Sequence, residues 1–179
     1  MTPVADDKGM DTDLAADATA PLAGMPGLLA VDHVGLAVAD LDAAIEFHTR
    51  VLGLVLTHRE TNAEQQVEEA MLAAPDAGPG AAQVQLICPT DPASTIARFL
   101  ARSGPGLQQL AYRVVDVVAA AEHLTRHGVR VLYAEPRRGT AGSLVTFAHP
   151  KDCGGVLVEL VQPAAGQPAA GPPAAGDAV

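Results

Sequence analysis

The sequence predicts an α+β fold in which two βαβββ modules pair into one curled mixed sheet around a cleft. The pattern of a strand, a capped helix and three further strands occurs twice, at about 30–90 and 105–162. Spacing within the copies also agrees, because Asp40 follows His33 by 7 residues and Asp116 follows Gln109 by 7 residues. Four strands and one helix cannot cover both faces of a sheet, so we expect the two modules to pair.

The first module is predicted to begin with a strand at 31–38, where β-branched and apolar residues alternate with small or polar ones. Asp40 is a typical helix N-cap, and Gly53 is a typical C-terminal stop. The apolar stripe of this predicted helix consists of Leu41, Ala44, Ile45, His48 and Leu52. Three strand-like runs follow, at 54–59, 67–72 and 83–88.

A linking helix is expected between Asp91-Pro92 and Gly104, and the pattern then restarts. The second module is predicted to contain a strand at 107–115, a helix at 117–127 capped by Asp116 and stopped by Gly128, and strands at 129–133, 144–148 and 156–161. A ferredoxin-like α+β domain is the competing architecture, but it would leave several of these strands without a place.

The two ends of the chain differ in composition from the duplicated region. Residues 1–29 are rich in Asp, Ala, Pro and Gly, and residues 163–179 form a low-complexity Pro/Ala/Gly repeat. Neither segment offers enough large apolar side chains to offset the entropy of ordering. We therefore expect a disordered acidic tail at 1–29, one domain at 30–162, and a disordered tail at 163–179.

Composition excludes several classes of protein. A net charge of -10 with only 11 Lys and Arg argues against nucleic-acid binding. No stretch of about 18 apolar residues is present for a membrane span, and the N-terminal region carries aspartates where a signal peptide carries positive charge. Two cysteines do not make a disulfide framework. These features predict a cytoplasmic protein.

Four polar residues fall at repeat-related positions on the first and last strands of the modules: His33, Gln85, Gln109 and Glu159. If the modules are pseudo-symmetric, these side chains face the same cleft. One imidazole, two amide oxygens and one carboxylate can surround a divalent metal. The alternative for each residue alone is an ordinary polar side chain on the solvent face of its strand.

Several segments resemble the methylmalonyl-CoA epimerases of the vicinal oxygen chelate superfamily. The resemblance covers residues 30–162 and neither tail. The segments that carry it are DHVGLAV (32–38), EQQVEEAML (64–72), QVQLICP (83–89), STIARFLARSGPGLQQLAYRV (94–114) and VRVLYAEPRRGTAGSLVTFAHPKDCGGVLVELVQ (129–162). The long last segment is specific to the epimerases, whereas the short strand motifs indicate only the superfamily.

The resemblance implies a vicinal oxygen chelate fold, an acyl-CoA substrate, a homodimer and a divalent metal such as cobalt or manganese. It places His33, Gln85 and Glu159 at three of the four metal-ligand positions and Glu69 at the position of the catalytic glutamate. Glu159 or a bound water is the candidate for the second proton carrier. Lys151, Arg137 and Arg138 are the candidate cations for the coenzyme A phosphates.

One departure from the family concerns the metal site. The family has a His-His pair where this chain has Gln108-Gln109, so an amide replaces the fourth, imidazole ligand. An amide oxygen ligates a borderline metal less well than an imidazole does. The sequence therefore predicts a weakly bound metal, with Gln109 as its fourth ligand.

These features predict an epimerase that interconverts (R)- and (S)-methylmalonyl-CoA by removing the C2 proton through a metal-stabilised enolate. A glyoxalase-like isomerase is one alternative, since glutamine is an acceptable ligand there. A non-catalytic protein that binds an acyl-CoA or another small molecule is the other. A ring-cleaving iron dioxygenase fits poorly, because it needs two histidines and one carboxylate and only His33 is present among the four positions.

Overall fold

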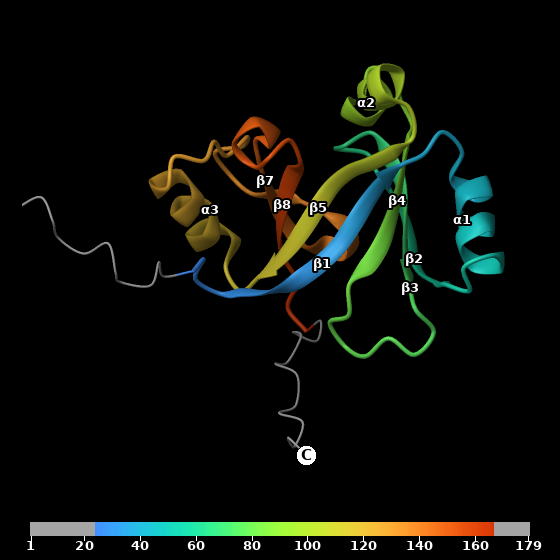
Figure 1. The fold of residues 1–179 in the computed structure, drawn as a ribbon, viewed down its shortest axis with the longest axis horizontal. Coiled ribbons are helices and arrows are strands. Elements are labelled where there is room, and N and C mark those ends of the chain that lie inside the picture. The colour runs from blue at the N-terminus through green and yellow to red at the C-terminus, as the bar shows by residue number, and fades with distance from the viewer. Residues whose placement is uncertain (1–23, 167–179) are drawn as a thin grey trace, which may run out of the picture.

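Residues 24–166 are described by a computed structural model, in which one curled eight-stranded sheet carries three α-helices (Figure 1). The elements in chain order are β1 (Leu28–Ala37), α1 (Leu41–Arg50), β2 (Val55–Asn62), β3 (Val67–Ala73), β4 (Gln83–Pro89), α2 (Thr95–Ser103), β5 (Gly106–Val114), α3 (Val117–Arg126), β6 (Arg137–Arg138), η1 (Thr140–Gly142), β7 (Leu144–Ala148), η2 (Pro150–Asp152) and β8 (Leu157–Gln162). Most of the two predicted tails lies outside the described residues. β1 begins two residues before the predicted domain boundary at residue 30.

The order of the strands confirms the predicted fold class. The sheet runs β2-β3-β4-β1-β5-β8-β7-β6, so each module contributes four consecutive strands. β1 pairs in parallel with β4, β5 pairs in parallel with β8, and the modules join where β1 and β5 pair antiparallel. β1 and β5 are therefore pseudo-equivalent strands at the centre of the sheet.

The predicted helix caps of both modules are confirmed. The Asp40 carboxylate accepts from the backbone N–H of Ala43, and the Asp116 carboxylate accepts from two N–H groups in the first turn of α3. Gly53 and Gly128 follow the two helices at φ 73° and 77°, where a residue with a Cβ is strained. The capping aspartate and the glycine thus fix where each of these helices begins and ends.

Two predicted features are wrong. The linking helix α2 is capped by Ser94, whose hydroxyl accepts from the backbone N–H of Ala97, and not by Asp91-Pro92. The predicted strand at 129–133 is reduced to a single bridge between Val131 and Ala148. Hydrogen bonds from the backbone and guanidinium of Arg130 to Asp152 tie this segment to η2, and the short β6 forms the sheet edge instead.

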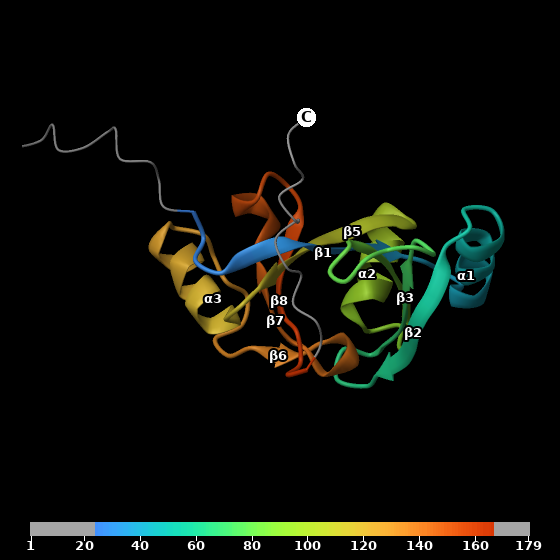
Figure 2. The same ribbon diagram turned by 90° about the horizontal axis from the view of Figure 1, so that it is seen from below.

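Helices α1 and α3 cover the outer face of the sheet, at opposite ends of its curve (Figure 2). α1 buries Leu41 against residues of β3 and β4, including Leu72 and Leu86. α3 buries Val117 against the equivalent strands of the second module, including Leu160. Since side chains alternate along a strand, the residues between these apolar positions face the inside of the curve.

Helix α2 lies over one end of the inner face. Its Ile96 packs with Ala37, Val67 and Ile87 in a separate apolar cluster. At the other end, Phe147 and neighbouring apolar residues form a second inner cluster with Ala111. The polar residues described below lie between these two clusters. None of the helices within residues 24–166 has the length and apolar character needed to cross a bilayer.

Candidate active site

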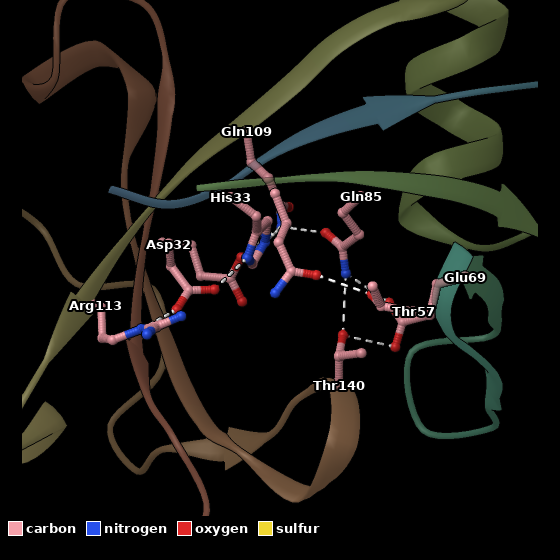
Figure 3. A network of polar contacts seen from close by, with 10 residues as sticks. Asp32, His33, Thr57, Glu69, Gln85, Gln109, Arg113 and Thr140 are labelled. Atoms are coloured by element: carbon pink, nitrogen blue, oxygen red, sulfur yellow. Dashed lines mark hydrogen bonds and ion pairs between the residues drawn. The ribbon is translucent and has the colours of Figure 1, made fainter. Parts of the chain in front are cut away.

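The four residues predicted to line the cleft lie on four adjacent strands: Gln85 on β4, His33 on β1, Gln109 on β5 and Glu159 on β8. All four are buried, with exposed fractions of 3–6%. The structure therefore brings this set together on the inner face, as the repeat-related spacing predicts. Figure 3 shows three of them, His33, Gln85 and Gln109.

Small residues separate the four side chains along the sheet. Gly35 pairs with Gln85 on one side and with Gln109 on the other, and Ala111 pairs with His33 and with Glu159. The long side chains thus extend across positions that carry little or no side chain of their own. A Cβ at Gly35 would lie 2.5 Å from Cγ of Gln109, so residue 35 must be glycine for Gln109 to take this course.

The four side chains contact one another directly. The Gln109 amide donates to Glu159 Oε2 and, at 3.2 Å, to Gln85 Oε1, and its Nε2 lies 3.4 Å from His33 Nε2. His33 Nε2 is in turn 3.1 Å from Glu159 Oε2. Three atoms that can ligate a cation therefore surround a single amide nitrogen.

A buried ion pair behind His33 orients its ring. Asp32 Oδ1 is 2.9 Å from His33 Nδ1, and Asp32 Oδ2 accepts a 2.6 Å hydrogen bond from Arg113 Nε (Figure 3). Burial alone would lower the pKa of His33, but hydrogen bonds to Asp32 and Glu159 outweigh it and raise the pKa to about 9. With Nδ1 held by Asp32, Nε2 is the nitrogen that faces the cleft.

Glu69, on β3, is the second buried carboxylate of the cleft and is 3% exposed. Its Oε2 accepts from Gln85 Nε2 at 2.8 Å, and its Oε1 accepts from the Thr140 hydroxyl at 2.9 Å. Gln85 Nε2 also donates to Thr140 Oγ1, at 3.0 Å, which closes a triangle. Burial raises the pKa of Glu69 to about 7, so near neutral pH the carboxyl exists in both proton states.

Thr140 belongs to the second module and reaches Glu69 from the short turn η1. The next residue, Ala141, has φ 53°, a conformation that residues with a side chain rarely adopt. The Ala141 N–H donates to Glu60 Oε1 on β2. This turn joins the far edges of the two modules and holds the Thr140 hydroxyl against Glu69.

These contacts border a cavity of about 660 Å³ on the inner face of the sheet. Glu69, Gln85, Gln109 and Glu159 line it together with apolar side chains of α2 and of the second module. The volume is in the range of small-molecule sites, which combine apolar walls with a few placed polar groups. A ligand in this cavity would meet the carboxylate of Glu69 and three members of the cluster, Gln85, Gln109 and Glu159, at the same time.

The three basic side chains predicted to bind the coenzyme A phosphates lie in different places. Arg137 lines the cavity, with its guanidinium 3.7 Å from the centre of the Tyr133 ring. Arg138 and Lys151 are exposed and are not among the residues that line it. Two further arginines that sequence reasoning missed, Arg98 and Arg102 of α2, also line the cavity.

The donor set fits a divalent cation by the chemistry of its atoms. His33 Nε2, Gln85 Oε1 and Glu159 Oε2 converge, which supplies one imidazole nitrogen and two oxygens. Within residues 24–166 no three His, Cys, Asp or Glu side chains are placed to hold a metal ion together, so a metal site here depends on glutamine oxygens. Gln109, the fourth predicted ligand, turns its N–H donors rather than its oxygen toward these atoms.

Comparison with known proteins identifies relatives of this fold. Residues 32–147 match the model of the glyoxalase/bleomycin resistance protein/dioxygenase superfamily. The ethylmalonyl-CoA/methylmalonyl-CoA epimerase of Cereibacter sphaeroides is 34% identical over 134 residues, which cover 74% of this chain and 96% of the relative. The human mitochondrial methylmalonyl-CoA epimerase is also 34% identical, over 74% of this chain and 73% of its own length.

Solved structures agree with these relatives. Methylmalonyl-CoA epimerase from Mycobacterium tuberculosis is 51% identical with a TM-score of 0.74, over 80% of this chain and 93% of that one. A variant of the Streptomyces coelicolor methylmalonyl-CoA epimerase, in complex with 2-nitronate-propionyl-CoA, is 47% identical with a TM-score of 0.73, over 77% and 99% of the two chains. The similarity to these two structures thus covers more than three quarters of this chain.

Proposed function

Because the chain belongs to the glyoxalase/bleomycin resistance protein/dioxygenase superfamily and, within it, to the methylmalonyl-CoA epimerases, we propose that it interconverts (R)- and (S)-methylmalonyl-CoA. The observation that carries the proposal is the buried carboxylate of Glu69, which faces the same cavity as Gln85, Gln109 and Glu159, with His33 in contact behind them. A carboxylate base beside groups that can hold an electrophile is what proton abstraction next to a carbonyl requires.

The reaction needs a proton to leave C2 and return on the opposite face. C2 lies between a thioester carbonyl and a carboxylate, so the electron pair of the C2–H bond can move onto the thioester oxygen as an enolate. Glu69 takes or returns the proton on its side of C2. Glu159, or a water molecule, remains the proposed proton carrier on the other side.

His33, Gln85 and Glu159 would hold a divalent metal, with Gln109 as the predicted fourth ligand. Such an ion would supply Lewis-acid stabilisation for the negative charge on the substrate oxygens. Asp32 and Arg113 keep His33 Nε2 turned toward this point. Cobalt and manganese remain the predicted ions, in keeping with the mixed nitrogen and oxygen donors.

Thr140 orients the proposed base. Thr140→Val keeps the shape of the side chain but removes the hydroxyl that donates to Glu69 Oε1. We expect kcat to fall by about tenfold, since a lost hydrogen bond to a charged group is worth about 1.5–3 kcal/mol and part of this loss is made up by water. Steady-state racemisation kinetics measure the change. Thr140→Ser should restore most of the activity, and an unchanged kcat in Thr140→Val would exclude the orienting role.

The acyl-CoA proposal rests on the cavity and on three arginines at its border. Arg137 was predicted from the sequence, and Arg98 and Arg102 are added by the structure. Guanidinium groups pair well with phosphates, so these three side chains are our candidates for the coenzyme A phosphates. The roles predicted for Arg138 and Lys151, and the predicted homodimer, stay predictions.

Deuterium wash-in at C2 tests the proposed reaction. The full chain is incubated with methylmalonyl-CoA in D₂O, with added Co²⁺ or Mn²⁺, and C2 exchange and racemisation are followed by NMR and chiral analysis. We expect both to proceed. A glyoxalase-like isomerase would show neither with this substrate but would turn over a hemithioacetal, and a non-catalytic protein would only bind the acyl-CoA. Absence of exchange and racemisation with both metals in excess rejects the proposal.

A further inference from the structure

The amide nitrogen of Gln109 occupies the point on which the other three members of the cluster converge. It lies within hydrogen-bond distance of Glu159 Oε2 and Gln85 Oε1 and 3.4 Å from His33 Nε2. A primary amide has two N–H donors and one acceptor oxygen. Both donors thus point at the carboxylate and the carbonyl that would otherwise face a cation.

We propose that Gln109 is an internal competitor of the metal rather than its fourth ligand, and that its N–H donors satisfy the site until a cation displaces them. This inference rests on the proposed function, because it concerns the metal site of the same epimerase. It changes the role predicted from the sequence for this residue. It also makes residue 109 the determinant of how readily the site exchanges between a metal-free and a metal-bound form.

The surroundings of Gln109 hold its side chain in this position. Gly35 leaves the space through which it passes, and a Cβ there would meet Gln109 Cγ at 2.5 Å, Cδ at 3.1 Å and Nε2 at 3.4 Å. Gln109 is itself 6% exposed, so the contacts with Glu159 and Gln85 form away from bulk water. Hydrogen bonds between buried groups of this kind are costly to leave unmade.

Metal binding has to break these hydrogen bonds, and in this proposal the Gln109 side chain withdraws from the three atoms. The Glu159 carboxylate then loses this N–H donor. His33, Gln85 and Glu159 remain as three protein ligands, which with bound water is a usual shell for a catalytic metal.

Metal affinity of Gln109→Ala and Gln109→Asn distinguishes a competitor from a ligand. Alanine removes the amide, and asparagine keeps it on a side chain one methylene shorter that does not reach the three atoms. If Gln109 competes, both variants bind Mn²⁺ and Co²⁺ about ten- to a hundredfold more tightly than the wild type, since a hydrogen bond to a charged group no longer opposes binding. If Gln109 is a ligand, both bind more weakly.

The measurement is isothermal calorimetry of the full chain, stripped of metal, titrated with each ion alone. Thermal unfolding supplies a second readout: the metal-free variants should melt below the wild type, and saturating Mn²⁺ should raise their Tm by more than it raises that of the wild type. Gln162→Ala is the control, because the Gln162 amide oxygen accepts from the Val117 N–H and the side chain does not line the cavity, so its metal affinity should equal that of the wild type. Gln109→His does not separate the two roles, since imidazole removes the amide and adds a ligand.

The proposal is overturned if both variants bind the metal ions no more tightly than the wild type does. It is also overturned if neither variant binds them detectably. Glu159→Gln should lose affinity in any case, which checks that the titrated site is the one described. The proposed epimerisation is tested separately by C2 exchange, so a negative result in calorimetry does not decide it. The two proposals can therefore fail separately. If the wild type exchanges C2 deuterium but Gln109→Ala binds metal no more tightly, the proposed epimerisation stands and the proposed role of Gln109 is rejected.

Discussion

Glu69→Gln is expected to lower kcat for C2 exchange by about 10²–10⁴-fold, the usual contribution of a general base. Glutamine has the shape of glutamate and keeps an oxygen and a nitrogen where Gln85 and Thr140 bind the carboxylate. It cannot accept the C2 proton, because an amide is a very weak base. KM should change little, since the cavity wall keeps its shape. Exchange of deuterium into C2, followed by NMR, measures the effect directly.

Glu68→Gln is the matched control for this prediction. Glu68 precedes Glu69 on β3 and therefore points to the other face of the sheet, where it pairs with Arg59 at the surface. Its substitution should leave kcat within about twofold of the wild type, since exposed ion pairs contribute little. A Glu69→Gln variant that keeps more than a tenth of the activity would show that another group removes the proton.

Arg113→Leu is expected to reduce the free energy of unfolding by about 3–5 kcal/mol, the typical cost of removing one partner from a buried ion pair. Arg113 and Asp32 are 7% and 6% exposed, and their atoms approach to 2.6 Å. Hydrogen bonds from His33 and Arg113 outweigh burial and lower the pKa of Asp32, so its carboxyl group is charged in the folded protein. Without Arg113, the Asp32 carboxylate stays in the interior with His33 as its remaining partner. Urea denaturation at neutral pH measures the loss.

Two comparisons distinguish this buried pair from a surface contact. Arg59→Leu breaks exposed pairs with Asp42 and Glu68 and should cost less than about 1 kcal/mol. The double variant with Asp32→Asn and Arg113→Leu should recover part of the stability, since the buried carboxylate that has lost its guanidinium partner is then absent. If Arg113→Leu costs no more than Arg59→Leu, the ion pair does not stabilise the fold. Reduced metal affinity in folded Asp32→Asn would in addition support its role in orienting His33.

The elements were predictable from the sequence where local signals agree with the fold. The alternation of apolar residues indicated eight strands, seven of which are present, and Asp40 and Asp116 indicated the starts of two helices. The strand at 129–133 was wrong because its apolar pattern cannot show that Arg130 bonds to Asp152 of η2 and draws the segment away from the sheet. Ser94 was missed as a cap because Asp91-Pro92 offers a similar signal three residues earlier.

Duplication determined much of the candidate site. His33, Gln85, Gln109 and Glu159 occupy related positions in the two modules, and this relation was visible in the spacing alone. Thr140, by contrast, has no local signal, because its partner Glu69 lies 71 residues away in the chain. Asp32 does have a local signal, since a carboxylate next to a histidine in the sequence often orients the imidazole ring. Its second partner, Arg113, is 81 residues away and was not predictable.

The sequence by itself thus determined which residues face the inner side of the sheet, since the two-residue period of a strand assigns each side chain to a face. Only the tertiary structure decided which atoms of those side chains meet. The predicted role of Gln109 shows the difference: the pattern placed its amide at the cleft, while the register beside Gly35 turned the N–H donors toward Glu159 and Gln85. Pattern is a property of neighbours along the chain, whereas the direction of a hydrogen bond depends on strands that meet only after folding.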